Sequence, residues 1–152
     1  MAAQVREALE GMAARLAAEH MTSHELDQLG ELLVQHAALP ALAAGEAYLQ
    51  QPGDEDFHFS TLRGARSERL EQLLFDQVYY QVRIHRVRSS TRPGRARAAF
   101  DEHKTMLAAL QAHNPDDAEI TMRRHVRNAR FSAQAAMTDS SAPPRQVQRK
   151  TA

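Results

Sequence analysis

The sequence contains no cysteine and no tryptophan, and aromatic residues make up only 5% of it. Without cysteine there can be no disulfide and no thiolate metal site, so any metal must be held by His, Asp or Glu. Few aromatic residues and no segment with period-two alternation argue against β-strands.

The chain also lacks a long apolar run and a net charge. It has no run of about 18 apolar residues, which is the length that could span a bilayer. Arg6, Glu7 and Glu10 interrupt the N-terminal apolar pattern, which is unlike a secretory signal. The 19 basic and 19 acidic residues cancel, so no overall positive field would attract DNA or an anionic membrane. We expect a cytoplasmic protein with no membrane partner.

Alanine, leucine, glutamate, glutamine and arginine are frequent, and these residues favour helices. Thr22 and Glu25 form a T-x-x-E capping box, and Asn114 followed by Pro115 indicates another helix start. The segment 41–51 is weakly helical at best. Clear helices are predicted over 2–19, 23–37, 52–64, 67–88, 95–112 and 115–136. The expected fold is an all-α antiparallel bundle of six or seven helices with a pocket in its interior.

One domain is expected over residues 1–137, because 152 residues suit a single core. Residues 138–152 lack an apolar pattern and contain Pro143-Pro144, which predicts a disordered tail. Within the first two helices, apolar periodicity predicts these inward side chains: Val5, Leu9, Met12, Leu16, Leu26, Leu29, Leu33 and Val34.

Four polar residues are expected to point inward from three helices. Asp54 and His58 are four residues apart, which places both on one face of a helix. His103 shares its face with Phe100, Met106 and other apolar residues, and His125 lies on a semi-polar face. One carboxylate and three neutral imidazoles suit Zn, Ni, Mn or Fe(II). We therefore hypothesise a divalent metal site at Asp54, His58, His103 and His125.

Simpler interpretations compete with this metal site. A histidine on an apolar face is more often a hydrogen-bonded core residue than a ligand, and Asp54 also suits a helix N-terminus. The other histidines lie near helix ends or on mixed faces and are predicted to be solvated: His20, His24, His36, His85 and His113.

Five segments in order resemble a known family. They are V-R-E-A-L-E-G-M-A-A-R-L-A-A-E in the first helix, D-E-D-F-H at 54–58, L-R-G-A-R-S-E-R-L at 62–70, E-H-K-T-M-L-A-A-L at 102–110 and A-E-I-T-M-R-R-H at 118–125. Together they resemble the FCD domain, the C-terminal effector-binding domain of FadR-type GntR transcriptional regulators. The matching segments cover nearly all of the expected globular part.

The resemblance implies a non-catalytic sensor in which Asp54, His58, His103 and His125 bind Zn, Ni or Mn. It also implies a small carboxylate effector and a homodimer. Arg6 would meet the effector carboxylate, although an intrahelical pair with Glu10 explains Arg6 equally well.

Arg83 and Asn128 are further effector-binding candidates. DNA contact would require the family's winged helix-turn-helix domain, which we do not find in these 152 residues. Two other functions remain open: a metal-dependent enzyme on a helical bundle, and a stand-alone helical interaction module.

Overall fold

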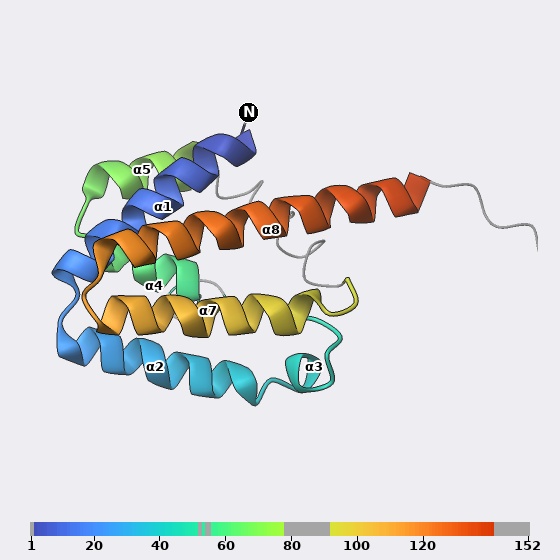
Figure 1. The fold of residues 1–152 in the computed structure, drawn as a ribbon, viewed down its shortest axis with the longest axis horizontal. Helices are drawn as coiled ribbons and strands as arrows, with labels where there is room; N and C mark the ends of the chain where they lie inside the picture. The colour runs from blue at the N-terminus through green and yellow to red at the C-terminus, as the bar shows by residue number, and fades with distance from the viewer. Residues whose placement is uncertain (1, 52, 54–55, 78–91, 142–152) are drawn as a thin grey trace, which may run out of the picture.

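The computed structural model describes residues 2–51, 53, 56–77 and 92–141, and the structural statements below concern these residues. They form seven helices and no strand, which confirms the predicted all-α fold (Figure 1). The helices are α1 Ala2–His20, α2 Ser23–Ala37, α3 Pro40–Ala43, α4 Phe57–Gly64, α5 Glu68–Gln77, α7 Arg95–Gln111 and α8 Pro115–Ser141.

The predicted helix starts at Thr22 and Asn114 are confirmed. The Thr22 hydroxyl accepts a hydrogen bond from the Glu25 backbone N–H, and the Glu25 carboxylate accepts one from the Thr22 N–H. The Asn114 side-chain oxygen accepts from the Asp117 N–H at 3.2 Å. These bonds satisfy backbone donors that a helix start otherwise leaves unpaired.

Helix α1 buries the predicted face only in part, with Leu9 and Leu16 half-buried against a second apolar cluster. Val5 and Met12 are exposed, whereas the buried positions are Arg6, Glu10, Gly11, Ala13, Ala14, Ala17 and Ala18. Small side chains let α8 lie close against α1: a Cβ added at Gly11 would come within 2.7 Å of Arg123 Cγ. The buried face of α1 is therefore the one whose small side chains allow α8 to approach closely, and not the one with the largest apolar side chains.

One inward prediction for α2 is also wrong. Val34 is 73% exposed, while Leu26, Leu29, Leu32 and Leu33 are buried. Val34 follows Leu33 directly, so it lies about 100° around the helix and outside the stripe that packs on α7.

Helix α4 begins at Phe57 and not at Pro52 as predicted. Asp56 is its N-cap, and its carboxylate accepts from the backbone N–H groups of His58 and Phe59 at 2.9 and 3.1 Å. Gly53 has φ of +78°, a left-handed conformation that a continuous right-handed helix cannot contain. Asp54 lies outside the described residues, and because α4 starts only at Phe57, the helix on which the sequence argument placed Asp54 and His58 one turn apart is not the observed one.

Helix α8 is longer than predicted. It continues to Ser141, so residues 138–141, predicted to belong to a disordered tail, are helical. Residues 142–152 lie outside the described part. The division into one domain and a tail stays a prediction.

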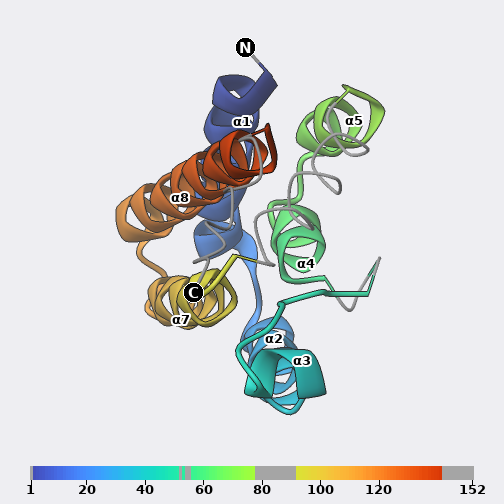
Figure 2. The same cartoon turned by 90° about the vertical axis from the view of Figure 1, so that its right-hand side faces the viewer.

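Four helices enclose the central region of the molecule. Helix α1 packs along α8 and against α4, and α7 packs on α8 and α2. Figure 2 shows α4 facing α1, α7 and α8 across the middle of the molecule. The main apolar core draws on α1, α2, α3, α4, α7 and α8 and includes Leu42, Phe57, Met106, Leu110 and Met122. No described helix is both long and apolar enough to cross a membrane.

Candidate metal centre

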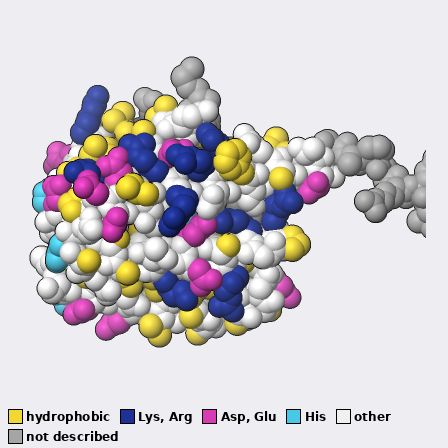
Figure 3. Space-filling view, viewed as in Figure 1, with side chains coloured by type: hydrophobic (Ala, Val, Ile, Leu, Met, Phe, Trp, Pro, Cys, Tyr) yellow, Lys and Arg dark blue, Asp and Glu magenta, His cyan; other side chains and the backbone are white. Residues whose placement is uncertain are grey.

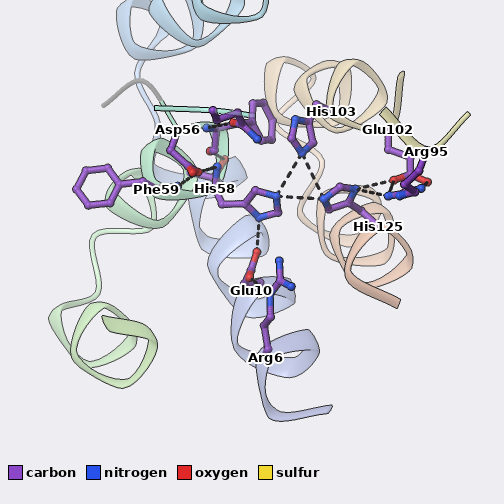
Figure 4. A network of polar contacts seen from close by, with 12 residues as sticks. Arg6, Glu10, Asp56, His58, Phe59, Arg95, Glu102, His103 and His125 are labelled. Atoms are coloured by element: carbon purple, nitrogen blue, oxygen red, sulfur yellow. Dashed lines mark hydrogen bonds and ion pairs between the residues drawn. The ribbon is translucent and has the colours of Figure 1, made fainter. Parts of the chain in front are cut away.

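Three buried histidines meet in this central region. His58 comes from α4, His103 from α7 and His125 from α8, and they are 9%, 1% and 4% exposed. Their Nε2 atoms form a nearly equilateral triangle with sides of 3.1, 3.2 and 3.3 Å (Figure 4). The three side chains can therefore present one nitrogen each to a single metal ion.

His58 is held by a carboxylate from α1. Its Nδ1 lies within a short hydrogen bond of Glu10 Oε2, and Glu10 Oε1 accepts from Arg6 Nε at 2.5 Å. Burial alone would raise the pKa of Glu10. The charge of Arg6 and the hydrogen bonds from Arg6 and His58 outweigh burial and hold this pKa well below its ordinary value. Glu10 is therefore ionised and accepts a hydrogen bond from His58 Nδ1–H.

His125 has the same arrangement with other residues. Its Nδ1 is 2.6 Å from Glu102 Oε2, and Arg95 donates to both oxygens of Glu102 at 3.0 and 2.6 Å. Burial would raise the pKa of Glu102, but hydrogen bonds from His125 and Arg95 lower it to about 2. Burial lowers the pKa of His125 to about 4 against the opposing effect of Glu102. His125 is therefore neutral near pH 7, with its proton on Nδ1.

His103 is held by neutral groups instead. Its ring stacks on Phe57 with centroids 4.4 Å apart and an interplanar angle of 12°. Its Nδ1 lies 3.1 Å from the Tyr48 hydroxyl, which is 2.6 Å from His36 Nδ1. His36 is only 4% exposed, so the prediction that it is solvated is wrong.

These hydrogen bonds decide which atoms face the centre. Glu10 and Glu102 are ionised and can only accept, so His58 and His125 carry their protons on Nδ1. In the neutral rings, Nε2 is then an unprotonated nitrogen with a lone pair. Two such lone pairs 3.1 Å apart repel each other unless a positively charged or donating group lies between them.

A metal ion fits this triangle. Two nitrogens at about 2.0–2.1 Å from Zn and at a tetrahedral angle are separated by about 3.3–3.4 Å, and slightly less at the smaller angles of octahedral sites. The observed separations of 3.1–3.3 Å agree with these values. Each imidazole also has the hydrogen-bonded support on its other nitrogen that metal-binding histidines typically have.

The structure brings together three of the four predicted ligands, His58, His103 and His125. Asp54 and Arg83 lie outside the described residues, so their roles stay predictions. Arg6 forms the predicted pair with Glu10, yet its Nη2 is buried without a hydrogen-bond partner. Asn128 donates from Nδ2 to Glu102 Oε1 at 2.8 Å, which supports the carboxylate behind His125.

Sequence reasoning missed the residues that surround the ligands, namely Glu10, Tyr48, His36, Arg95 and Glu102. One signal was present for Glu10. It shares the alanine-rich face of its helix with Arg6, and an Arg–Glu pair four residues apart can be buried because its charges compensate. Tyr48 has no comparable signal, because it follows the short α3 in irregular chain.

The family comparison agrees with this geometry. The family model described as the FCD domain matches residues 2–128. The chain therefore belongs to the FCD family, whose members are the regulatory effector-binding domains of GntR-type transcriptional regulators. A comparison with curated proteins finds no match.

Because His125 is buried, we expect the metal-free protein to lose stability in acid. Its folded-state pKa of about 4 lies below the ordinary histidine value of 6.5, so the unfolded chain binds the proton more tightly. The stability that neutral His125 contributes is present above pH 6.5 and is lost as the pH falls toward 4. Metal-free protein should lose about 2 kcal/mol from this group between pH 7 and pH 5. Urea unfolding at the two pH values measures it.

A matched variant isolates His125 from the other histidines. His125→Gln has no titrating ring and can still donate to Glu102, so its stability should fall less between pH 7 and pH 5. Equal losses in the two proteins would contradict the prediction.

Proposed function

We propose that this domain senses a small carboxylate that binds at a divalent metal held by His58, His103 and His125. The convergence of three Nε2 atoms at 3.1–3.3 Å, two of them fixed as lone pairs, carries the proposal. Zn, Ni and Mn are the candidate metals, and Asp54 is the proposed fourth ligand. Neutral imidazoles suit Zn and Ni, and a carboxylate broadens the choice to Mn.

The charges around the site favour an anionic ligand. Glu10 is matched by Arg6, and Glu102 is matched by Arg95. These four charges cancel, and neutral imidazoles add none. The +2 charge of a bound divalent cation would therefore be left without a counter-charge from these residues, which is costly in a buried site. Asp54 would remove one charge, and a carboxylate ligand would remove the other.

A cavity beside His58 supports a small ligand. It measures about 40 Å³ and lies between α1, α4 and α5. Its polar lining includes Glu10, His58 and Thr61, and its apolar lining includes Leu74 and Phe75. This volume holds roughly three water-sized groups. The carbon part of a small acid would fit such a space.

The chain's own residues couple the site to the fold. The imidazoles come from α4, α7 and α8, and Glu10 adds α1. A metal-bound carboxylate would favour the arrangement in which these helices lie closest together, and binding would shift the population toward it. Dimerisation, a cytoplasmic location and DNA contact through a winged helix-turn-helix domain remain predictions.

The proposal favours sensing over catalysis because of the state of the nearby carboxylates. Among the described residues, Glu10 and Glu102 are the carboxylates that contact the cluster, and both are ionised and bound to an arginine and a histidine. Neither is available to accept a proton from a metal-bound water.

Figure 3 shows basic and acidic side chains interspersed over one face, with no extended basic surface there.

Calorimetric titration of metal-stripped protein with Ni or Zn tests the metal site. Wild type should bind one ion per chain, and His103→Gln/His125→Gln should bind none. The control variant His20→Gln/His113→Gln also lacks two histidines, but these contact backbone carbonyls of Ala65 and Ala18 away from the cluster. It should bind as wild type does. Binding that survives in the first variant rejects the site.

A second titration tests the ligand class. Zn-loaded protein is titrated with a panel of small monocarboxylic and dicarboxylic acids and with their neutral amides. Acids should bind only when the metal is present, and the amides should not bind. Equal binding of an acid to metal-stripped protein would show that the carboxylate is held elsewhere.

A further inference from the structure

We propose that Tyr48 and His36 form a positioning relay that fixes the tautomer of His103, so that its Nε2 lone pair faces the other two histidines. The inference rests on the proposed metal site and deepens it. It assigns a role to two residues outside the ligand set, one of which belongs to α2.

The relay is buried and its central ring is fixed in place. Tyr48 is 6% exposed and His36 is 4% exposed. The Tyr48 ring meets Phe100 edge-on with centroids 5.8 Å apart, and it meets His36 edge-on at 5.4 Å. These contacts hold the hydroxyl between His36 Nδ1 at 2.6 Å and His103 Nδ1 at 3.1 Å.

His103 needs such a relay because its support differs from that of the other ligands. Ionised Glu10 and Glu102 can only accept, so they fix the protons of His58 and His125 on Nδ1. A tyrosine hydroxyl can donate or accept, and it therefore leaves the His103 tautomer open by itself. The hydrogen-bond partner on the far side of the hydroxyl can set which way the hydroxyl donates.

The distances indicate that His36 accepts the hydrogen bond from the Tyr48 hydroxyl. The shorter O···N separation of 2.6 Å is typical of a hydroxyl that donates to an imidazole nitrogen. When Tyr48 donates to His36 Nδ1, its oxygen accepts from His103 Nδ1–H at 3.1 Å. His103 then carries its proton on Nδ1 and presents an unprotonated Nε2. With the opposite direction, His103 would carry a proton on Nε2 and could not bind a metal through it.

The relay makes an unusual prediction for mutants. Tyr48→Phe removes the acceptor for His103 Nδ1–H, and zinc affinity should fall about 10- to 100-fold, as for other groups behind metal ligands. His36→Leu frees Tyr48 to donate to His103 Nδ1, which favours the wrong tautomer, so affinity should fall at least as far. The double variant Tyr48→Phe/His36→Leu should bind no more weakly than Tyr48→Phe alone, because His36 acts through the hydroxyl.

Zinc titrations of these variants are combined with a direct measurement of the tautomer. Long-range ¹H–¹⁵N spectra of the metal-stripped protein distinguish a protonated Nδ1 from a protonated Nε2 in His103. Wild type should show the Nδ1–H form. His36→Gln supplies an amide oxygen as an acceptor and should restore most of the affinity lost in His36→Leu. His24→Gln, on the exposed side of α2, should match wild type.

The outcomes separate this inference from the proposed function. If wild type binds no zinc, the metal site fails and the relay fails with it. If wild type binds zinc and Tyr48→Phe binds it equally with unchanged His103 signals, the relay alone is rejected. Additive losses in the double variant also reject it. Should Tyr48→Phe not fold, His36→Leu and His36→Gln decide, because equal affinities in these two overturn the relay.

Discussion

Metal-saturated protein should melt about 8–16 °C above metal-stripped protein when free zinc is 1,000 times its dissociation constant. A ligand at this excess that binds the folded state alone stabilises it by about 4.1 kcal/mol. For a chain of this size, each kcal/mol raises the melting temperature by about 2–4 °C. Differential scanning calorimetry, with zinc set from the titrated dissociation constant, measures the shift.

The magnitude follows from where the three imidazoles are held. They come from three helices that are distant in the sequence, so a metal would cross-link α4, α7 and α8. An unfolded chain offers no such convergence, and its histidines bind the ion much more weakly. His103→Gln/His125→Gln should therefore show little or no zinc-dependent shift. A similar rise in this variant would mean that zinc stabilises the fold at another place.

The inward positions of the three clustered histidines are predictable from the sequence because their helices are strongly patterned. His103 shares a face with Phe100 and Met106, so the helical period alone turns it inward. His125 lies on α8, whose start at Asn114 and Pro115 is correctly predicted. Convergence on one point is a property of the fold; the inward-facing positions suggested it, and the resemblance to the FCD family supports it.

The helix start near Asp54 could not be predicted because two local signals compete. Pro52 suits a first turn and Asp56 suits an N-cap, and each is a valid start by itself. The left-handed φ of Gly53 favours the later start, and nothing in the local sequence requires a glycine to adopt it. His58 lies within the helix with either start, and in the structure it is the second residue of α4.

The supporting groups were missed because burial of a charge depends on distant partners. The inward face of α1 is recognisable only once α8 is known to pack on its small residues. Glu10 is then buried with Arg6 from its own helix and His58 from α4. Similarly, His36 lies near the end of α2, and Tyr48 from beyond α3 gives it a buried partner.

Replacement of Glu10 by alanine should destabilise the metal-free protein by about 3–5 kcal/mol. Arg6 and Glu10 have side chains only 7% and 8% exposed, and Arg6 Nη2 is already buried without a partner. Loss of the carboxylate would leave a buried guanidinium without a counter-charge, which costs far more than loss of an exposed ion pair. Urea unfolding of metal-stripped protein measures the change. Glu7→Ala on the same helix breaks an exposed pair with Arg127 and should cost about 0–1 kcal/mol.

The double variant Arg6→Met/Glu10→Leu separates stability from metal binding. Apolar side chains of similar volume can replace a buried ion pair with little loss, so this variant should be nearly as stable as wild type. It also removes the acceptor that fixes the proton of His58 on Nδ1, so its zinc affinity should still fall about 10- to 100-fold. A stable double variant with wild-type affinity would show that Glu10 only compensates Arg6. A weakened affinity would show that the same carboxylate holds the fold together and prepares His58 for the metal.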